Sequence, residues 1–217
     1  MKRSCPSRLL RIGWGGILPF SVGAMLILAR CSGGVSTPTN PTLSNCLSRA
    51  VFGDPAQSPY TLPYPVGSAY VVLQAYCTTQ SHANQLAYDF EMPIGTPIVA
   101  ARGGVIVDLV DAYEDNDRNS SHFNYIMIRH DDNTTAFYAH VQHYGIFVRL
   151  NDTVGRGQLI ANSGSAGTPV ADLHFGVYRT WPIQDGNDIA VNFRNAQGPL
   201  DERGGLQQGI AYLALAY

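Results

Sequence analysis

Short apolar or alternating runs separated by turn residues fill the chain from about Tyr60 onward. Runs of five to eight residues are typical of β-strands, in which successive side chains point to opposite faces of the sheet. A short helix is compatible only with "LSRAVF" and the C-terminal "GIAYLALAY". The pattern predicts an all-β sandwich or barrel. The runs are "AYVVLQAY", "TPIVAARGGVIVDLV", "NYIMIRH", "TTAFYAHV", "IFVRL", "QLIANSG" and "LHFGVYRT".

Length and charge limit the number of domains and the class of partner. The chain has 217 residues, 45% of them apolar, which favours one compact domain with appendages. Its formal net charge is −2, and only 14% of its residues are charged. Because a nucleic-acid backbone is held mainly by clustered basic side chains, we exclude nucleic acid as a partner.

The N-terminus has the layout of a secretory signal, which we assign to residues 1–31. Four basic residues precede an apolar run over residues 12–29, and small residues follow it. A retained membrane anchor is the alternative, because 18 residues lie at the lower edge of the length that crosses a bilayer. A lipid attached to Cys31 is a third alternative, disfavoured by Arg30. We predict an exported protein of the periplasm or cell envelope that meets the membrane only through such an anchor.

Composition divides the rest of the chain into three segments. Residues 32–45 are rich in Ser, Thr, Pro, Asn and Gly and are typical of a tether. We therefore predict a linker and N-terminal extension over residues 32–59, a main domain over 60–200 and a C-terminal extension over 201–217.

Export would also change how the cysteines behave. If Cys5 and Cys31 leave with the signal or carry a lipid, Cys46 and Cys77 remain in the mature chain. An oxidising compartment favours a disulfide between them. Two separate thiols are the alternative, because the sequence does not give the distance between them.

The histidines are confined to one part of the chain. All six lie between residues 82 and 174. Zinc binds imidazole nitrogens and carboxylates in a tetrahedral set, and a catalytic zinc keeps its fourth position for water. Two histidines and one acid would suffice for such a site. In "VADLHFGVYRT", Asp172 and His174 lie two residues apart and therefore face the same side of a strand.

A longer pattern resembles a known family. The order "SH…AYDFEMPIGTPIVAARGGVIVDLV…NYIMIRHDDNTTAFYAHV…VGRGQLIANSGSAGTPVADLHFGVYR" is similar to that of the lysostaphin/LytM-type zinc endopeptidases of bacterial cell walls. The resemblance covers roughly residues 60–199. It implies antiparallel β-sheets that form a groove, in the barrel-sandwich or duplicated hybrid motif arrangement. It also implies that the protein is an enzyme that hydrolyses peptide bonds in peptidoglycan cross-links or stem peptides.

The same resemblance assigns the site residues. It makes His82, Asp89 and His174 the ligands of Zn²⁺ and His140 a catalytic histidine beside the metal. Two features depart from the family pattern. Six residues separate His82 from Asp89, where the family commonly has three. The first histidine of the family's His-x-His pair is replaced by Asp172.

The replacement at Asp172 leaves three interpretations open. An aspartate could accept a proton from the attacking water, as a glutamate does in other zinc peptidases. It could instead be an additional metal ligand or a hydrogen-bond partner of one. The third interpretation is a domain that no longer cleaves and that binds cell wall or regulates a wall-hydrolase partner. Because all three ligands and His140 are present, we predict an enzyme, with Asp172 as its second catalytic residue.

The remaining histidines are expected to lie outside the site. His130 ends a predicted strand before a turn-like run, and His122 lies in a polar segment between strands. His143 follows His140 by three residues. Each is more often a solvated or hydrogen-bonded side chain than a ligand.

Overall fold

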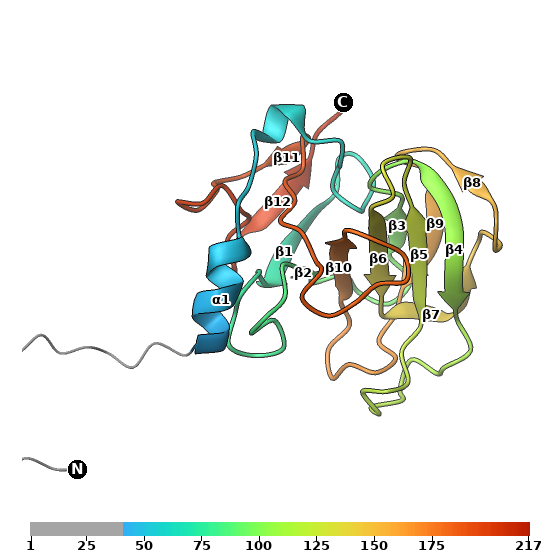
Figure 1. Ribbon diagram of the computed structural model, residues 1–217. Coiled ribbons are helices and arrows are strands. Elements are labelled where there is room, and N and C mark those ends of the chain that lie inside the picture. The colour runs from blue at the N-terminus through green and yellow to red at the C-terminus, as the bar shows by residue number, and fades with distance from the viewer. Residues whose placement is uncertain (1–40) are drawn as a thin grey trace, which may run out of the picture. The chain divides into compact units, whose positions relative to one another are not determined.

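The computed structural model describes residues 41–217 (Figure 1). The predicted signal or anchor over residues 1–31 lies outside the described residues, as does the first part of the predicted linker. Within residues 41–217, no helix is both long enough and apolar enough to cross a membrane. One α-helix, α1 (Pro41–Arg49), and a short 3₁₀ helix, η1 (Pro55–Gln57), precede the strands.

A nine-stranded sheet forms the frame of the molecule, and all its pairings are antiparallel. In Figure 1, its strands β10, β6, β5 and β4 lie side by side. Its strands in spatial order are β11 (Ala196–Gln197), β12 (Ala211–Ala214), β1 (Ala69–Gln74), β2 (Tyr88–Phe90), β10 (Leu173–Tyr178), β6 (Thr135–Ala139), β5 (Tyr125–Arg129), β4 (Gly104–Val110) and β8 (Thr153–Val154).

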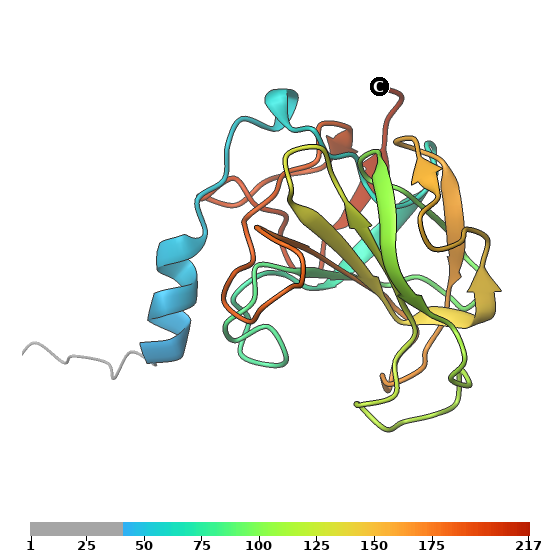
Figure 2. The same cartoon turned by 45° about the vertical axis from the view of Figure 1, so that its right-hand side comes forward.

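A second sheet has three antiparallel strands, β3 (Pro97–Val99), β9 (Leu159–Ser163) and β7 (Val141–Ile146). In Figure 2, the orange strand β9 of this sheet lies to the right of the green strand β4 of the larger sheet. The two sheets confirm the prediction of an all-β fold built from antiparallel strands.

Alternation along β10 separates the core from the opposite face of the sheet. Leu173, Phe175 and Val177 are fully buried on one face. The ring of Phe175 packs against Tyr138 and Phe193, with centroids 5.1 and 5.6 Å apart. Burial of each such side chain contributes roughly 1.5–3 kcal/mol. This packing holds the other face of β10, which carries His174, away from the core.

Three segments differ from the predicted elements. "GIAYLALAY" contains strand β12 and no helix, because its residues pair with β1 and bury Tyr212 there. Helix α1 ends at Arg49, so only the first part of "LSRAVF" is helical. In "IFVRL", β7 stops at its first residue. A turn follows, in which the backbone N–H of Arg149 donates to the carboxylate of Asp152 at 2.8 Å.

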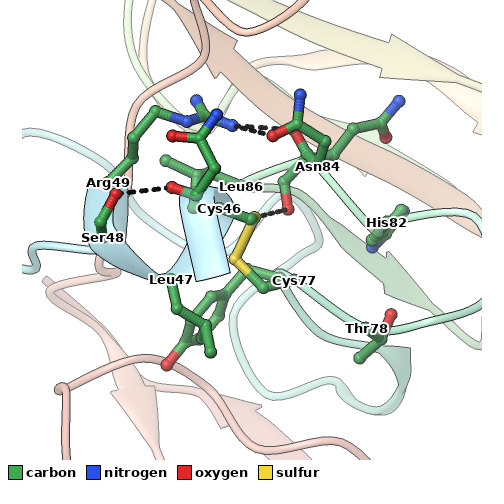
Figure 3. Close-up of a disulfide and its surroundings, with 12 residues drawn as sticks. Cys46, Leu47, Ser48, Arg49, Cys77, Thr78, His82, Asn84 and Leu86 are labelled. Carbon is green, nitrogen blue, oxygen red and sulfur yellow. Dashed lines mark hydrogen bonds between the residues drawn. A yellow bond between two sulfur atoms is a disulfide. The ribbon is translucent and has the colours of Figure 1, made fainter. Parts of the chain in front are cut away.

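A disulfide joins α1 to the loop that follows β1. Cys46 and Cys77 are bonded, with their Cα atoms 5.7 Å apart (Figure 3). Arg49 of α1 also donates to the backbone carbonyl of Asn84 at 2.8 Å and forms an ion pair with Asp188. The carboxylate of Asp188 accepts a hydrogen bond from the backbone N–H of Leu86. The loop between β1 and β2 is therefore tied to α1 near both of its ends.

We expect the double variant Cys46→Ala/Cys77→Ala to lower the free energy of unfolding by about 3 kcal/mol. The bond links residues 31 apart in sequence, so its loss restores conformational freedom to the unfolded chain. Urea unfolding of the variant and of the unaltered, oxidised protein measures the difference. A difference below about 0.5 kcal/mol would contradict the expectation.

Candidate metal centre

The floor of the candidate site is a row of paired residues that runs across three neighbouring strands of the larger sheet. His174 of β10 lies directly opposite Asp89 of β2 on one side and Ala139 of β6 on the other. Side chains at directly opposed positions have Cβ atoms about 4.5–5.5 Å apart and share a face. Asp89 and His174 therefore meet because of strand register, and the small side chain of Ala139 leaves room beside the imidazole.

His82 reaches this row from the loop between β1 and β2. Its side chain is fully buried, and its Nδ1–H donates to the carbonyl of Ala75 at 3.1 Å. This bond leaves Nε2 unprotonated in the neutral ring and directed at the row. His82 Nε2 lies 3.2 Å from Asp89 Oδ1 and 3.2 Å from His174 Nδ1. Six intervening residues thus do not prevent His82 from reaching Asp89.

The three side-chain atoms fit a zinc ion. His174 Nδ1 and Asp89 Oδ1 are 2.8 Å apart, and both lie 3.2 Å from His82 Nε2. Ligand atoms at zinc bond lengths in a tetrahedral set are about 3.3 Å apart. One imidazole nitrogen from each histidine and one carboxylate oxygen is also a donor set that zinc prefers. His82, Asp89 and His174 could therefore hold Zn²⁺ and leave a fourth position open.

Charge within this triad favours the ionised carboxylate. Burial acts to raise the pKa of Asp89, but the hydrogen bonds and charges of His174 and His82 outweigh it and lower that pKa. Burial acts to lower the pKa of His82, and the hydrogen bond and charge of Asp89 outweigh it and raise that pKa. The carboxylate form of Asp89 is the form that binds a metal.

His140 lies beside the triad, directly after β6. Its φ is +64°, a left-handed conformation that few residues other than glycine adopt. Its Nδ1–H donates to the carbonyl of Ala166 at 2.9 Å, and its ring centroid lies 6.4 Å from that of His174. Burial lowers the pKa of His140, so the neutral ring is favoured near pH 7. In that form Nε2 is a proton acceptor.

Asp172 lies two residues before His174 and lines the same cleft. Only 5% of its surface is exposed. Its Oδ1 has no hydrogen-bond partner among the described residues. Burial, together with the nearby charge of Asp89, raises the pKa of Asp172 to about 7. A buried carboxyl with an unpaired oxygen and such a pKa is a common feature of catalytic sites.

An open cleft of about 810 Å³ lies over these groups. Away from the histidines and acids, its walls are uncharged, because they consist of apolar side chains, amides and hydroxyls. Its lining residues are Leu73, Gln74, Gln80, Ser81, Gln85, Asp89, Ser120, Phe123, Phe137, Ala139, His140, Gly167, Thr168, Pro169, Val170, Asp172, His174 and Gln208.

One wall of the cleft is held by contacts between two loops. The backbone N–H of Ser165 donates to the carboxylate of Asp115 at 3.0 Å, and Arg118 donates to the carbonyl of Thr168. Gly164 allows this approach, because a Cβ there would lie 2.4 Å from the Asp115 carboxylate and 2.5 Å from the Cα of Gln142. The same loop supplies the carbonyl that orients His140.

The other three histidines lie outside the triad and the cleft. His130 is buried and donates from Nδ1 to the carbonyl of Gly103 at 2.9 Å. His122 pairs with Asp117, 2.8 Å away. His143 faces Glu114, with 3.2 Å between Nδ1 and Oε2. Their partners lie away from the triad, in line with the prediction that these histidines lie outside the site.

One residue at the site has no signal in the sequence. Gln74, the last residue of β1, donates from Nε2 to Asp89 Oδ2 at 3.0 Å. A glutamine at the end of an alternating run is not distinguishable from any polar residue at a strand end. Only the pairing of β1 with β2 brings it to the site.

The chain matches a known peptidase family. Residues 83–192 match the family model described as Peptidase family M23. The matched segment contains Asp89, His140, Asp172 and His174 and begins one residue after His82. No match was found among curated protein sequences.

Solved structures that match part of this chain include an M23 protein and lysostaphin. The catalytic domain of a mutant of the prophage-encoded M23 protein EnpA from Enterococcus faecalis is 23% identical, with a TM-score of 0.45 over 58% of this chain and 93% of that one. The catalytic domain of the antimicrobial peptidase lysostaphin from Staphylococcus simulans is 23% identical, with a TM-score of 0.42 over 56% of this chain and 86% of that one.

We expect His82→Ala, Asp89→Ala and His174→Ala each to weaken zinc binding by more than about 100-fold. Loss of a residue that only hydrogen-bonds to a metal ligand costs up to about 100-fold in affinity, and loss of a ligand should cost more. Each removes one of the three converging ligand atoms. Competition with a chromophoric chelator measures the affinity. His143→Ala is the control, because this histidine faces Glu114 and should leave zinc affinity unchanged. Unchanged affinity in any of the three variants would exclude that residue as a ligand.

Proposed function

Because this chain belongs to peptidase family M23, we propose that it is an exported zinc metalloendopeptidase that hydrolyses peptide bonds in peptidoglycan cross-links or stem peptides. The observation that carries the proposal is the convergence of the buried His82 with Asp89 and His174, which line an open cleft. The signal-like layout of residues 1–31 and the disulfide between Cys46 and Cys77 support export.

In this proposal, three residues of the centre bind the metal and His140 transfers a proton. His82, Asp89 and His174 would hold Zn²⁺, which when bound would supply a Lewis acid for the scissile carbonyl and lower the pKa of water to about 7. The neutral ring of His140 can accept at Nε2 the proton that remains on the oxygen of the attacking water after the first proton has left, and, as an imidazolium, donate it to the leaving amine. The carbonyl of Ala166 keeps that ring in position.

Asp172 is the second proton-handling group in this proposal. Its carboxyl lines the cleft two residues before a ligand, and its Oδ1 is free of partners among the described residues. As a carboxylate it accepts the proton of the attacking water. Only in its protonated form could it donate a hydrogen bond to the oxyanion, as the family's histidine could.

A second candidate function is a module that binds cell wall or regulates another wall hydrolase without cleaving. The observation that favours it is the aspartate at position 172, because the loss of an oxyanion donor typically costs about 100-fold to 1,000-fold in rate. Such a module would bind wall fragments or a hydrolase partner and release no amino groups.

Incubation with cross-linked peptidoglycan separates the two functions. We expect the purified, zinc-loaded chain to release new amino groups, and we expect a chelator to stop the release because it removes the metal. Newly released amino groups are counted with an amine-reactive reagent. A protein that holds zinc and releases none would contradict the peptidase and favour the regulatory module.

We expect Asp172→Asn to lower the rate of cleavage by at least about 100-fold, the usual contribution of a general acid or base. Zinc content should stay the same, because the three ligands are unchanged. Asp117→Asn is the matched control, since this aspartate pairs with His122 and lies outside the cleft. Full activity of the Asp172→Asn variant would remove the proposed role.

A further inference from the structure

Gln74 is brought to the site by an irregularity in strand pairing. Val72 of β1 is paired with Phe90 of β2, but the next pair along is Gln74 with Asp89. In regular pairing, Leu73 would stand opposite Asp89. A β-bulge adds one residue on one strand and can redirect a side chain next to a site. Here it places the amide of Gln74 beside Asp89.

The amide of Gln74 uses its full hydrogen-bonding capacity. Nε2 donates to Asp89 Oδ2 at 3.0 Å and to Ser81 Oγ at 2.8 Å. Oε1 accepts from the backbone N–H of Ser81 and from the hydroxyl of Thr78, both at 3.2 Å. The orientation of the amide follows, because a carboxylate only accepts and a backbone N–H only donates. The reversed amide would face a carboxylate oxygen with its own oxygen.

These bonds reach two of the three proposed ligands. The bond to Asp89 Oδ2 sets the rotation of the carboxylate and leaves Oδ1 directed at His82 and His174. The bonds to Ser81 hold the residue directly before His82. The carbonyl of Ala75, directly after Gln74, accepts the Nδ1–H of His82. One end of β1 therefore supports both a strand ligand and a loop ligand.

We propose that Gln74 is a positioning residue of the metal centre, whose amide fixes Asp89 and the loop that carries His82 in the geometry that binds zinc. The inference rests on the proposed function for the identity of the metal. It explains how a loop with six residues between His82 and Asp89 keeps a defined shape. Partners of this kind set ligand orientation, and their loss costs about 10-fold to 100-fold in metal affinity.

The test compares Gln74→Met with Gln80→Met in the full chain. Methionine keeps the length of the side chain and removes all four hydrogen bonds of Gln74. Gln80 lines the same cleft, is exposed, and has no side-chain hydrogen bond among the described residues. We expect zinc affinity, measured by chelator competition, to fall about 10-fold to 100-fold in Gln74→Met and to stay unchanged in Gln80→Met.

Two further measurements distinguish positioning from a general structural role. The visible absorption spectrum of the cobalt-substituted protein should change in Gln74→Met, because it reports coordination geometry. Urea unfolding of the metal-free protein should give similar midpoints for the two variants. Gln74→Ala, which removes the same amide, serves if the methionine variant does not fold. A zinc affinity within about threefold of the unaltered protein, with an unchanged cobalt spectrum, would overturn the inference.

The same data separate this inference from the proposed function. Neither zinc affinity nor the cobalt spectrum requires a substrate. Tight zinc binding that depends on Gln74, in a protein that cleaves no peptidoglycan, would contradict the peptidase and support the positioning role. Cleavage of peptidoglycan by a protein whose zinc affinity does not depend on Gln74 would support the peptidase and contradict the positioning role. Failure of the unaltered chain to bind zinc would overturn both.

Discussion

The antiparallel pairing of β10 with β2 is the constraint on which the whole centre depends. It places His174 opposite Asp89, and every other group of the site is arranged around that pair. A slip of one residue would turn His174 into the core and expose Phe175, because side chains alternate between the faces. The buried contacts of Phe175 oppose such a slip. The register of the metal centre is therefore maintained by the opposite, apolar face of the same strand.

Much of this frame is readable from the sequence. Alternation in "LHFGVYRT" and "NYIMIRH" predicts strands, and it predicts that Asp172 and His174 share a face, which the cleft lining bears out. The family resemblance names Asp89, His140 and His82 as further members of the site. The structure places all of them at the cleft or in the triad, and zinc binding and catalysis remain predictions.

Contacts between distant segments are the part that the sequence does not reveal. The bulge that aligns Gln74 with Asp89 depends on how two strands meet, and no local pattern encodes it. Strand β12 lies in a segment whose composition also suits a helix, and its pairing with β1 decides the outcome. The sequence gives the count of residues in the loop that carries His82, but the anchoring of that loop to α1 depends on Arg49 and the disulfide.

The pairing of β1 with β12 also determines the order in which the protein can be completed. Residues 69–71 pair with residues 211–213, so this edge of β1 has no partner in the sheet until residues 211–213 have been synthesised. Such long-range pairing slows folding, and an open strand edge invites pairing with other chains. The strand whose end supports the metal ligands is thus among the last to gain both of its neighbours in the sheet.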